Sequence, residues 1–248
     1  NDAFHGCVNL TSLAMPDSIA RIGTYAFYQC TSMEMDIVAD NVTEIGQRAF
    51  YQSAITSFSS ENVGTIGNYA FSRCPNLQAV RLGEGCTYVG ADCFAVSKNL
   101  KKVAIGSNVA TIMNYAFGDC SGLTEIVIYA VTPPSLPYTN ALTNTNNCPI
   151  YVPDDSVEAY KNALNWVSYA PRIYSLTDYT IGAIVIDFAD DEVKTICLAN
   201  YDLNGDGELQ NREAWTVTSF GKVFSGKPIT SFRESARFIN VTEYGLNS

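Results

Sequence analysis

The sequence predicts a mainly β repeat solenoid with short parallel strands, ended by a C-terminal cap helix and followed by a small α-helical module. Three observations predict this class. A phenylalanine returns at intervals of 21 or 23 residues, apolar residues recur in fixed order within each interval, and the repeat gives way after residue 132 to segments with helical spacing. Such a period is typical of a solenoid, whose units bury their apolar faces only against their neighbours. The phenylalanines are Phe4, Phe27, Phe50, Phe71, Phe94 and Phe117.

Each interval contains the pattern of one short strand. Leu13 and Met15 in the first copy, and Val103 and Ile105 in the fifth, have the period-two spacing of a strand with one buried face. We therefore expect every coil to contribute one strand to a parallel sheet. A small residue also follows each phenylalanine after three positions, at Cys7, Cys30, Ser53, Cys74, Ser97 and Cys120.

An apolar residue followed by glycine comes after the strand pattern in four copies. Such a pair suits a turn that needs close backbone approach or a positive φ. Met113 takes the glycine's place in the fifth copy, so we expect that coil to turn differently. The four pairs are Ile22-Gly23, Ile45-Gly46, Ile66-Gly67 and Val89-Gly90.

Two copies depart from the pattern. The third copy, which contains Phe50, is two residues shorter than the others. In the second copy, Asp36 falls where Leu13 lies in the first. Because an unpaired carboxylate in an apolar core is costly, we expect a local bulge or a change of register to turn Asp36 outward.

The copies "AFHGCVNLTSLAMPDSIARIG" and "AFSRCPNLQAVRLGEGCTYVG" resemble the BspA-like leucine-rich repeats of bacterial surface proteins. The resemblance implies a solenoid of leucine-rich repeat type over residues 1–132. BspA-like proteins are associated with adhesion to host matrix proteins and to other bacteria. Carried over to this chain, the resemblance implies a secreted or surface adhesin that binds a protein ligand.

The eight cysteines favour buried free thiols. Four of them occupy one repeated position, and Cys86 and Cys93 replace apolar core residues of other copies. A repeated buried cysteine acts as a small apolar residue with a weak hydrogen-bond donor. Disulfides between stacked positions and metal binding remain alternatives.

Residues 133–176 are predicted to cap the solenoid. We expect Pro133 and Pro134 to stop the ladder of backbone hydrogen bonds. A short strand at 150–152 and a helix from about 154 should follow, with Val157, Tyr160 and Leu164 on one apolar face. The resemblance assigns Trp166 and Tyr169 to the core of this cap, and an aromatic platform for a sugar is the alternative.

Residues 177–248 form the third module, with further repeats after it as an open alternative. Residues 202–213 read DLNGDGELQNRE, which fits an EF-hand calcium loop at full length. Gly207 allows the sharp turn and Leu209 fills the apolar position. We therefore predict one calcium ion. Its ligands are Asp202, Asn204, Asp206, Glu208 through its carbonyl, and Glu213, with Gln210 acting through water.

The flanks of this loop fit an EF-hand. Asp190 is a plausible N-cap for an entering helix, and an exiting helix should begin near Asn211 and include Trp215. EF-hands normally pair, and the segment around Ser231 is our candidate for a degenerate partner hand, with Ile229 bridging to the loop. Similar loops accompany BspA-like repeats in some family members. Dockerins carry two such loops, so a single loop argues against a dockerin.

Composition restricts the function. The chain has 248 residues and a formal net charge of −10, without a basic run, so nucleic acid and anionic membrane are disfavoured as partners. No apolar stretch is long enough to span a membrane. The chain has a single histidine, His5, and its paired carboxylates suit helix N-termini better than acid-base catalysis. We therefore expect no enzyme activity.

The sequence favours a binding module that lies outside the cell or on its surface, secreted or anchored through an upstream part. The first residues already belong to a coil, so its open N-terminal edge is a candidate for self-association. An architectural spacer of a larger surface protein, or a carbohydrate-binding or dockerin-like accessory, are the alternatives. The expected outward strand row is Thr11, Ser12, Ala14, Gln78, Ala79, Arg81, Lys101, Lys102, Ala104, Thr124, Glu125 and Val127.

Overall fold

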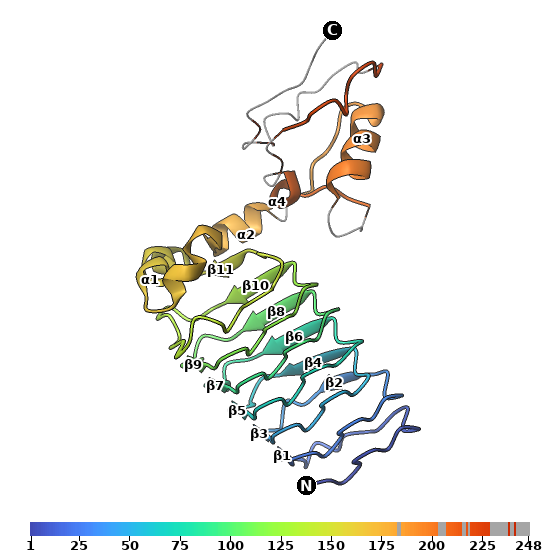
Figure 1. Ribbon diagram of the computed structural model, residues 1–248, viewed down its shortest axis with the longest axis vertical. Helices are drawn as coiled ribbons and strands as arrows, with labels where there is room; N and C mark the ends of the chain where they lie inside the picture. The colour runs from blue at the N-terminus through green and yellow to red at the C-terminus, as the bar shows by residue number, and fades with distance from the viewer. Residues whose placement is uncertain are drawn as a thin grey trace. The chain divides into compact units, whose positions relative to one another are not determined.

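A computed structural model describes residues 1–182, 185–202, 207–214, 217, 219–228, 238 and 241 of the chain. The chain divides into two compact units, Asn1–Leu176 and Thr177–Ser248. Figure 1 shows the helices and strands of both, and each unit is described here by itself.

The first unit is a ladder of coils built on two parallel sheets (Figure 1). Each coil from the second to the fifth gives one strand to each sheet, so our expectation of one strand per coil was wrong. The long sheet contains β2 (Asp36–Val38), β4 (Ser57–Ser60), β6 (Ala79–Leu82), β8 (Lys102–Ile105), β10 (Glu125–Ile128), β11 (Ile150–Val152) and β12 (Ile173–Ser175). The short sheet contains β1 (Arg21–Ile22), β3 (Glu44–Ile45), β5 (Thr65–Ile66), β7 (Tyr88–Val89) and β9 (Thr111–Ile112).

A turn centred on the repeated phenylalanine forms the third side of each coil. The N–H of each of the six phenylalanines donates to a carbonyl of the next coil, at 2.6 to 3.0 Å. The residues two before and two after the phenylalanine adopt positive φ. Backbone N–H groups on both sides of the phenylalanine can therefore donate to carbonyls of the next coil. These residues are Asp2, Gly6, Tyr25, Gln29, Arg48, Gln52, Tyr69, Arg73, Asp92, Val96, Tyr115 and Asp119.

The phenylalanine rings form one continuous stack along the ladder. Neighbouring ring centroids are 5.0 to 5.2 Å apart, and the ring planes lie within 5 to 11° of parallel. Phe50, Phe71, Phe94 and Phe117 are fully buried, and Phe4 of the first coil is partly buried. The stack therefore forms the central part of a hydrophobic core that extends through all the coils.

The apolar residue before each glycine belongs to a strand of the short sheet rather than to a turn. Gly46 has no positive φ, but a Cβ built there would lie 2.5 Å from the backbone N of Thr24. Close approach between coils therefore explains the glycine. Met113 donates its N–H to Val89 O at 3.0 Å, and left-handed residues flank Phe117 as in the other coils. Our expectation of a different turn at Met113 was wrong because the turn is held by backbone contacts with the neighbouring coils.

A change of register places Asp36 outside, as predicted. Ile37 takes the buried position and is aligned with Phe58, and Asp36 is exposed beside Ser57. The Asp36 carboxylate accepts hydrogen bonds from the hydroxyls of Thr56 (2.7 Å) and Ser57 (2.6 Å). These bonds lower the pKa of Asp36.

The short third copy loses one residue on each side of its long-sheet strand. Phe58 lies eight positions after Phe50, whereas Val103 lies nine positions after Phe94. After the strand, Val63 lies three positions after Ser60, whereas Val109 lies four positions after Ile105. Both losses fall between strands, so β4 keeps its register with β2 and β6.

The ladder continues past the two prolines, contrary to our expectation. Ile112 donates its N–H to Ser135 O at 3.0 Å, and Asp119 donates to Thr143 O at 2.9 Å. The strand β11 then pairs with β10, which confirms the strand predicted at 150–152. Proline lacks its own N–H, but the donors here come from the preceding coil, which explains why the ladder survives.

Residues after β11 form η1 (Asp154–Ser156), α1 (Val157–Asn162) and η2 (Trp166–Arg172). Tyr160, Trp166 and Tyr169 are buried in the core of the first unit, where the hydroxyl of Tyr160 donates to Ala130 O at 2.8 Å. Burial of Trp166 and Tyr169 leaves no exposed platform for a sugar ring. Leu164 is 83% exposed, so its predicted place on the apolar face was wrong: the helix ends at Asn162, and the backbone turns extended at Ala163.

The described part of the second unit contains α2 (Leu176–Gly182), α3 (Asp191–Tyr201) and α4 (Asn211–Ala214). Asp190 is the N-cap of α3, as predicted, and its carboxylate accepts the N–H of Glu192 and of Val193. A separate small core holds this unit together. Its buried members are Ile186, Val193, Ile196, Cys197, Leu209, Ala214, Val217, Phe220, Phe224, Phe238 and Val241.

Candidate functional site

The repeated thiols act as internal hydrogen-bond donors. Cys74 Sγ donates to Phe50 O at 3.1 Å and Cys120 Sγ donates to Phe94 O at 3.1 Å, each one coil earlier. At Ser97 a hydroxyl makes the same bond to Phe71 O at 3.0 Å. Burial raises the pKa of Cys74 and Cys120 to about 12, so both stay protonated at neutral pH. Seven of the eight cysteines are buried free thiols, as favoured above, and Cys7 is exposed.

The expected strand row is exposed only in part. Arg81, Lys101 and Lys102 are exposed, but Glu125 and Val127 are buried, and their assignment to the row was wrong. The long sheet does not end at β10, because β11 adds a further strand in which Tyr151 lies beside Val127 and is also buried.

Several charges on and beside this row have a partner next to them. Asp36 is bound by two hydroxyls, Arg81 pairs with Glu61, and Lys102 Nζ lies 3.5 Å from Glu125 Oε1. Opposite charges that already pair with each other leave less potential for a partner.

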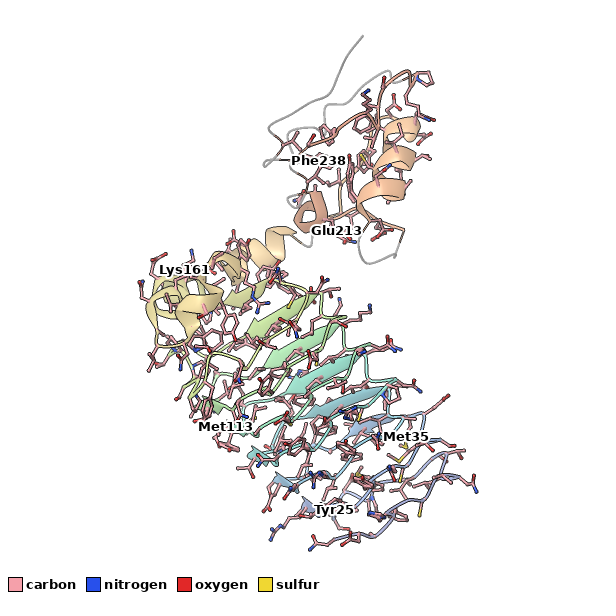
Figure 2. All side chains as sticks on the ribbon, viewed as in Figure 1. Tyr25, Met35, Met113, Lys161, Glu213 and Phe238 are labelled. Atoms are coloured by element: carbon pink, nitrogen blue, oxygen red, sulfur yellow. The ribbon has the colours of Figure 1, made fainter. Side chains whose placement is uncertain are left out.

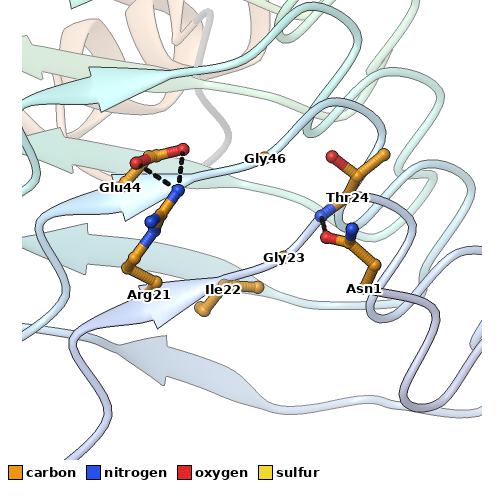
Figure 3. Close-up of a pocket in the computed structure, with 7 residues that line it drawn as sticks. All are labelled: Asn1, Arg21, Ile22, Gly23, Thr24, Glu44 and Gly46. Carbon is orange, nitrogen blue, oxygen red and sulfur yellow. Dashed lines mark hydrogen bonds and ion pairs between the residues drawn. The ribbon is translucent and has the colours of Figure 1, made fainter.

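An open hollow of about 530 Å³ lies on the short sheet at the first coils (Figure 3). Arg21 and Glu44 form an ion pair across it at 2.8 Å, and the Asn1 side chain accepts the N–H of Thr24. Its polar groups are therefore engaged with one another, and the hollow gathers no set of groups suited to catalysis.

A surface that we call the turn face is formed by the turns of the second, third and fourth coils, residues 24–29, 47–52 and 68–73. Its centre is an alternating stack in which Arg48 lies between two tyrosines. The guanidinium carbon of Arg48 is 5.8 Å from the ring centroid of Tyr25 and 4.9 Å from that of Tyr69. Arg48 Nη1 also donates to the hydroxyl of Tyr25 at 2.8 Å, which raises the pKa of Arg48.

A second aromatic row runs beside the first. Tyr28 and Tyr51 stack at 5.2 Å with 7° between their planes, and His5 of the first coil stacks on Tyr28 at 4.8 Å. Beside this row, Gln29 Nε2 of the second coil donates to Gln52 Oε1 of the third coil at 2.9 Å. Figure 2 labels Tyr25 among the side chains of these coils.

Our sequence reasoning missed the turn face because it looked for ligands on the strand row. The signal lies at fixed positions next to each repeated phenylalanine. A histidine or tyrosine stands one residue after it in the first three coils, and a tyrosine or arginine stands two before it in the second, third and fourth. A column of one residue class at a fixed offset is how a solenoid displays a surface in sequence.

In the second unit, Asp202 and Gly207, the predicted first and sixth positions of the calcium loop, are hydrogen-bonded to each other. The N–H of Gly207 donates to Asp202 Oδ2 at 3.0 Å, and Gly207 has a φ of 82°. Asp202, Glu208 and Glu213 are described, whereas Asn204 and Asp206 lie outside the described residues. No group of three or more His, Cys, Asp or Glu suited to a metal is found among the residues described.

The end of the loop leads into α4. Glu213 Oε2 accepts the N–H of Gln210 at 2.9 Å, and both side chains are buried. The apolar position, Leu209, is buried, and its carbonyl accepts the N–H of Ile186 at 2.8 Å. Glu213, the last position of the loop, thus lies in the first turn of α4 with its carboxylate bound to the backbone of Gln210. Figure 2 labels Glu213.

Three predictions about this unit concern residues outside those described. They are the inclusion of Trp215 in the exiting helix, the degenerate partner hand around Ser231, and the bridge from Ile229 to the loop. Among the residues described, the loop pairs through an antiparallel bridge between Val185 and Gln210.

The groups considered for catalysis have other contacts. His5 is exposed and stacks on Tyr28. Asp190 caps α3, and Asp154 and Asp155 lie in the first turn of η1. Among the helices that the structure describes, none combines the length and the apolar character needed to cross a membrane.

Comparison with known proteins addresses the first unit. The model of the BspA type leucine-rich repeat region matches residues 1–124 in six copies. No curated protein matches the chain.

Three solved structures are similar to the chain at low identity. A leucine-rich repeat protein of T. pallidum is 22% identical, with a TM-score of 0.35, over 44% of this chain and 62% of that one. One from Bacteroides ovatus is 19% identical, with a TM-score of 0.44, over 68% and 49%. A leucine-rich cell surface protein from Faecalibacterium prausnitzii is 16% identical, with a TM-score of 0.33, over 70% and 61%. The matched part thus spans between half and two thirds of each of these structures.

Proposed function

The chain belongs to the BspA-type leucine-rich repeat family, and from this premise we propose that it is a non-enzymatic, adhesin-like binding protein. It acts outside the cell or at a cell surface and recognises a protein partner through the outer surface of its solenoid. Family membership supports the binding role, because stacked repeats present extended surfaces on a rigid support.

The observation that carries this proposal is the turn face. Three successive coils there place four tyrosines and two arginines at adjacent positions. Tyrosine and arginine are enriched at protein interfaces and supply most of their binding energy. A spacer has no need for an aromatic surface of this kind, so the turn face favours the binding protein over the architectural alternative.

The experiment is a binding panel with the whole chain. Immobilised chain is exposed to host matrix proteins, bacterial surface proteins and a glycan array, beside a double variant Tyr28→Ala/Tyr51→Ala. We expect saturable binding of at least one protein that falls about tenfold or more in the double variant. Binding only to glycans would support the carbohydrate accessory, and binding to neither class would support the spacer.

We also propose that residues 202–213 bind one calcium ion with a structural role. Asp202, Asn204, Asp206 and Glu213 would supply side-chain oxygens and Glu208 its carbonyl. The bond from Gly207 N–H to Asp202 and the buried position of Leu209 support this arrangement. Bound calcium would join the two ends of the loop, which follow α3 and lead into α4.

Calorimetric titration of the apo chain with calcium tests the site. We expect one equivalent to bind, and Asp202→Asn to weaken binding at least about tenfold because it removes a charged ligand. Asp191→Asn is the matched control, since Asp191 lies in the first turn of α3 and outside the loop. Equal binding by all three proteins would contradict the calcium proposal and leave the adhesin proposal standing.

The helical segment before β12 supports the predicted cap. The ring N–H of Trp166 donates to Pro134 O at 2.7 Å, and Tyr160 donates to Ala130 O, so residues 154–172 are fastened to the last coils. We infer that this segment closes the C-terminal end of the apolar core, as solenoids require.

The first coil supports self-association as a lesser proposal. Leu10, Leu13 and Met15 are only partly buried, whereas Met33 and Ile37 of the second coil are buried. Sedimentation velocity over a range of concentrations measures this, and Leu13→Glu should shift any dimer to monomer. A monomer at every concentration would exclude pairing through this edge.

A further inference from the structure

The turn face is free of carboxylates in a strongly acidic chain. The chain has 25 Asp and Glu residues and a net charge of −10, yet residues 24–29, 47–52 and 68–73 contain none. The same ranges contain Arg48 and Arg73. The equivalent turns on either side carry Asp2, Asp92 and Asp119. The turn face is therefore a positive block bounded by negative charge.

The two arginines of this block are not neutralised. Among the ion pairs of the described residues, Arg21, Arg81 and three lysines hold carboxylates, and Arg48 and Arg73 do not. Arg48 has its faces against two tyrosine rings and one amino group on a tyrosine hydroxyl. Its position is thus fixed before a ligand arrives, which lowers the entropic cost of binding.

Tyr28 presents its edge rather than its faces. The rings of Tyr28 and Tyr51 stack on each other, and His5 covers the other side of Tyr28. A sugar ring stacks on an open aromatic face, which this arrangement does not offer at Tyr28. Hydroxyls on ring edges, together with free guanidinium N–H groups, instead suit carboxylate acceptors.

We propose that the turn face is the docking surface for an acidic peptide segment of the partner protein. Its Asp or Glu carboxylates bind Arg48 and Arg73 and accept hydrogen bonds from the hydroxyls of Tyr28 and Tyr51. The charge of the block and the edge-on tyrosines favour this occupant over a neutral glycan. The inference rests on the proposed binding function and adds to it the place and the chemistry of recognition.

The test measures fluorescence anisotropy of a labelled peptide with alternating Glu and Ser, titrated with the whole chain. A Gln/Ser peptide of equal length is the uncharged control, and polygalacturonate is the acidic glycan. We expect the Glu/Ser peptide to bind and the Gln/Ser peptide to bind at least about tenfold more weakly, with a loss of affinity as salt is raised.

Variants locate the binding. Arg48→Gln/Arg73→Gln should weaken the Glu/Ser peptide about tenfold or more, whereas Arg21→Gln/Arg81→Gln, which removes two arginines outside the turn face, should not. Tyr28→Phe/Tyr51→Phe keeps the stacked rings and should weaken binding severalfold through the lost hydroxyls, with Tyr129→Phe as its control. Circular dichroism confirms that each variant is folded.

Three results would overturn the inference. The first is equal binding of the Glu/Ser and Gln/Ser peptides. The second is an equal loss of peptide affinity in the variants Arg48→Gln/Arg73→Gln and Arg21→Gln/Arg81→Gln. The third is tighter binding of polygalacturonate than of the Glu/Ser peptide. The protein panel separates this failure from that of the proposed function. A matrix or surface protein that still binds Arg48→Gln/Arg73→Gln would contradict the docking surface alone, whereas a panel without any protein ligand would contradict the binding function itself.

Discussion

The buried repeated thiols, Cys30, Cys74 and Cys120, each link two coils through a weak hydrogen bond at a position where serine also occurs. Cys74 and Ser97 both donate to the phenylalanine carbonyl one coil earlier. The position therefore selects for a small side chain that carries a donor, because a buried carbonyl without a partner is costly. This explains the mixture of cysteine and serine in the repeated slot.

Replacement of Cys74 should separate size from hydrogen bonding. Cys74→Ser retains a donor and should change the free energy of unfolding by about 1 kcal/mol or less. Cys74→Val removes one of the two donors to Phe50 O, which keeps the N–H of Ser53, and should cost about 1 to 2 kcal/mol. Urea unfolding followed by circular dichroism measures both. A valine variant as stable as the wild type would show that the thiol acts only by filling space.

The buried thiols should also make stability fall at alkaline pH. Burial raises the pKa of Cys86 and Cys148 to about 11 and that of Cys74 and Cys120 to about 12. In the unfolded chain a thiol loses its proton near pH 8.5, so above that pH the unfolded state binds fewer protons than the folded state. The stabilisation is complete below about pH 8.5 and is lost as the pH rises toward these folded values, by about 1.4 kcal/mol per pH unit for each thiol.

The measurement is the urea midpoint between pH 7 and 10.5. Cys74→Ser removes one titrating thiol and should give a shallower decline than the wild type. Parallel curves for the two proteins would mean that Cys74 does not contribute to the alkaline loss.

At the level of the element, a coil is three-sided, and its sides were not equally visible in the sequence. The long-sheet strands and the phenylalanine core were predictable, because alternation and a constant interval report them directly. The short-sheet strands are only two residues long, too short to show alternation, and were taken for turns. The prolines misled because the residue after them keeps the ladder intact: Ser135 accepts the N–H of Ile112 and donates its own N–H to Ala110 O at 2.8 Å.

The shortened third coil depends on one hydroxyl. Ser60 is buried; its Oγ donates to Ala39 O at 2.7 Å and accepts the N–H of Val63 at 3.1 Å. In the second coil the corresponding N–H, that of Val42, donates to a backbone carbonyl instead, at 3.0 Å. Since Ala39 and Val42 have the same spacing as Ser60 and Val63, the side chain of Ser60 takes the role that a backbone carbonyl has in the second coil.

Ser60→Ala should therefore destabilise the ladder by about 1 to 3 kcal/mol, since it leaves Val63 N–H without its acceptor. Ser59→Ala, one position away on the outer side of β4, should stay within about 0.5 kcal/mol of the wild type. Chemical unfolding of both variants provides the comparison. Similar losses in the two would assign the effect to β4 in general rather than to this hydroxyl.

At the scale of the whole molecule, the chain consists of two units with separate cores. The calcium loop of the second unit was predicted from its ligand spacing and stays a prediction, because Asn204 and Asp206 lie outside the described residues. The turn face of the first unit was missed, because nothing in the local sequence distinguishes an aromatic side chain in a surface stack from one in the core. Only the stacking of coils shows that the half-buried rings of Tyr28 and Tyr51 lie side by side on one face.

Separate cores predict two unfolding transitions, of which one responds to calcium. At free calcium about 100 times the dissociation constant, binding stabilises the second unit by about 2.7 kcal/mol and raises its transition temperature, and a chelator reverses this. The first unit should melt at the same temperature in both conditions. Differential scanning calorimetry of the whole chain measures both transitions, and an unchanged thermogram after chelation would contradict the structural calcium role.

The third coil, with a residue missing on each side of an undisturbed strand, also bears on how such a gene changes. Differences in length between coils fall in the segments between strands. Each joint, by which we mean the contact between two neighbouring coils, is made by parallel strands and stacked phenylalanines. Unequal crossing over that adds or removes a whole coil therefore recreates a joint that already exists. The protein can change its reach in increments of about 5 Å, the ring spacing of 5.0 to 5.2 Å, while its fold stays the same.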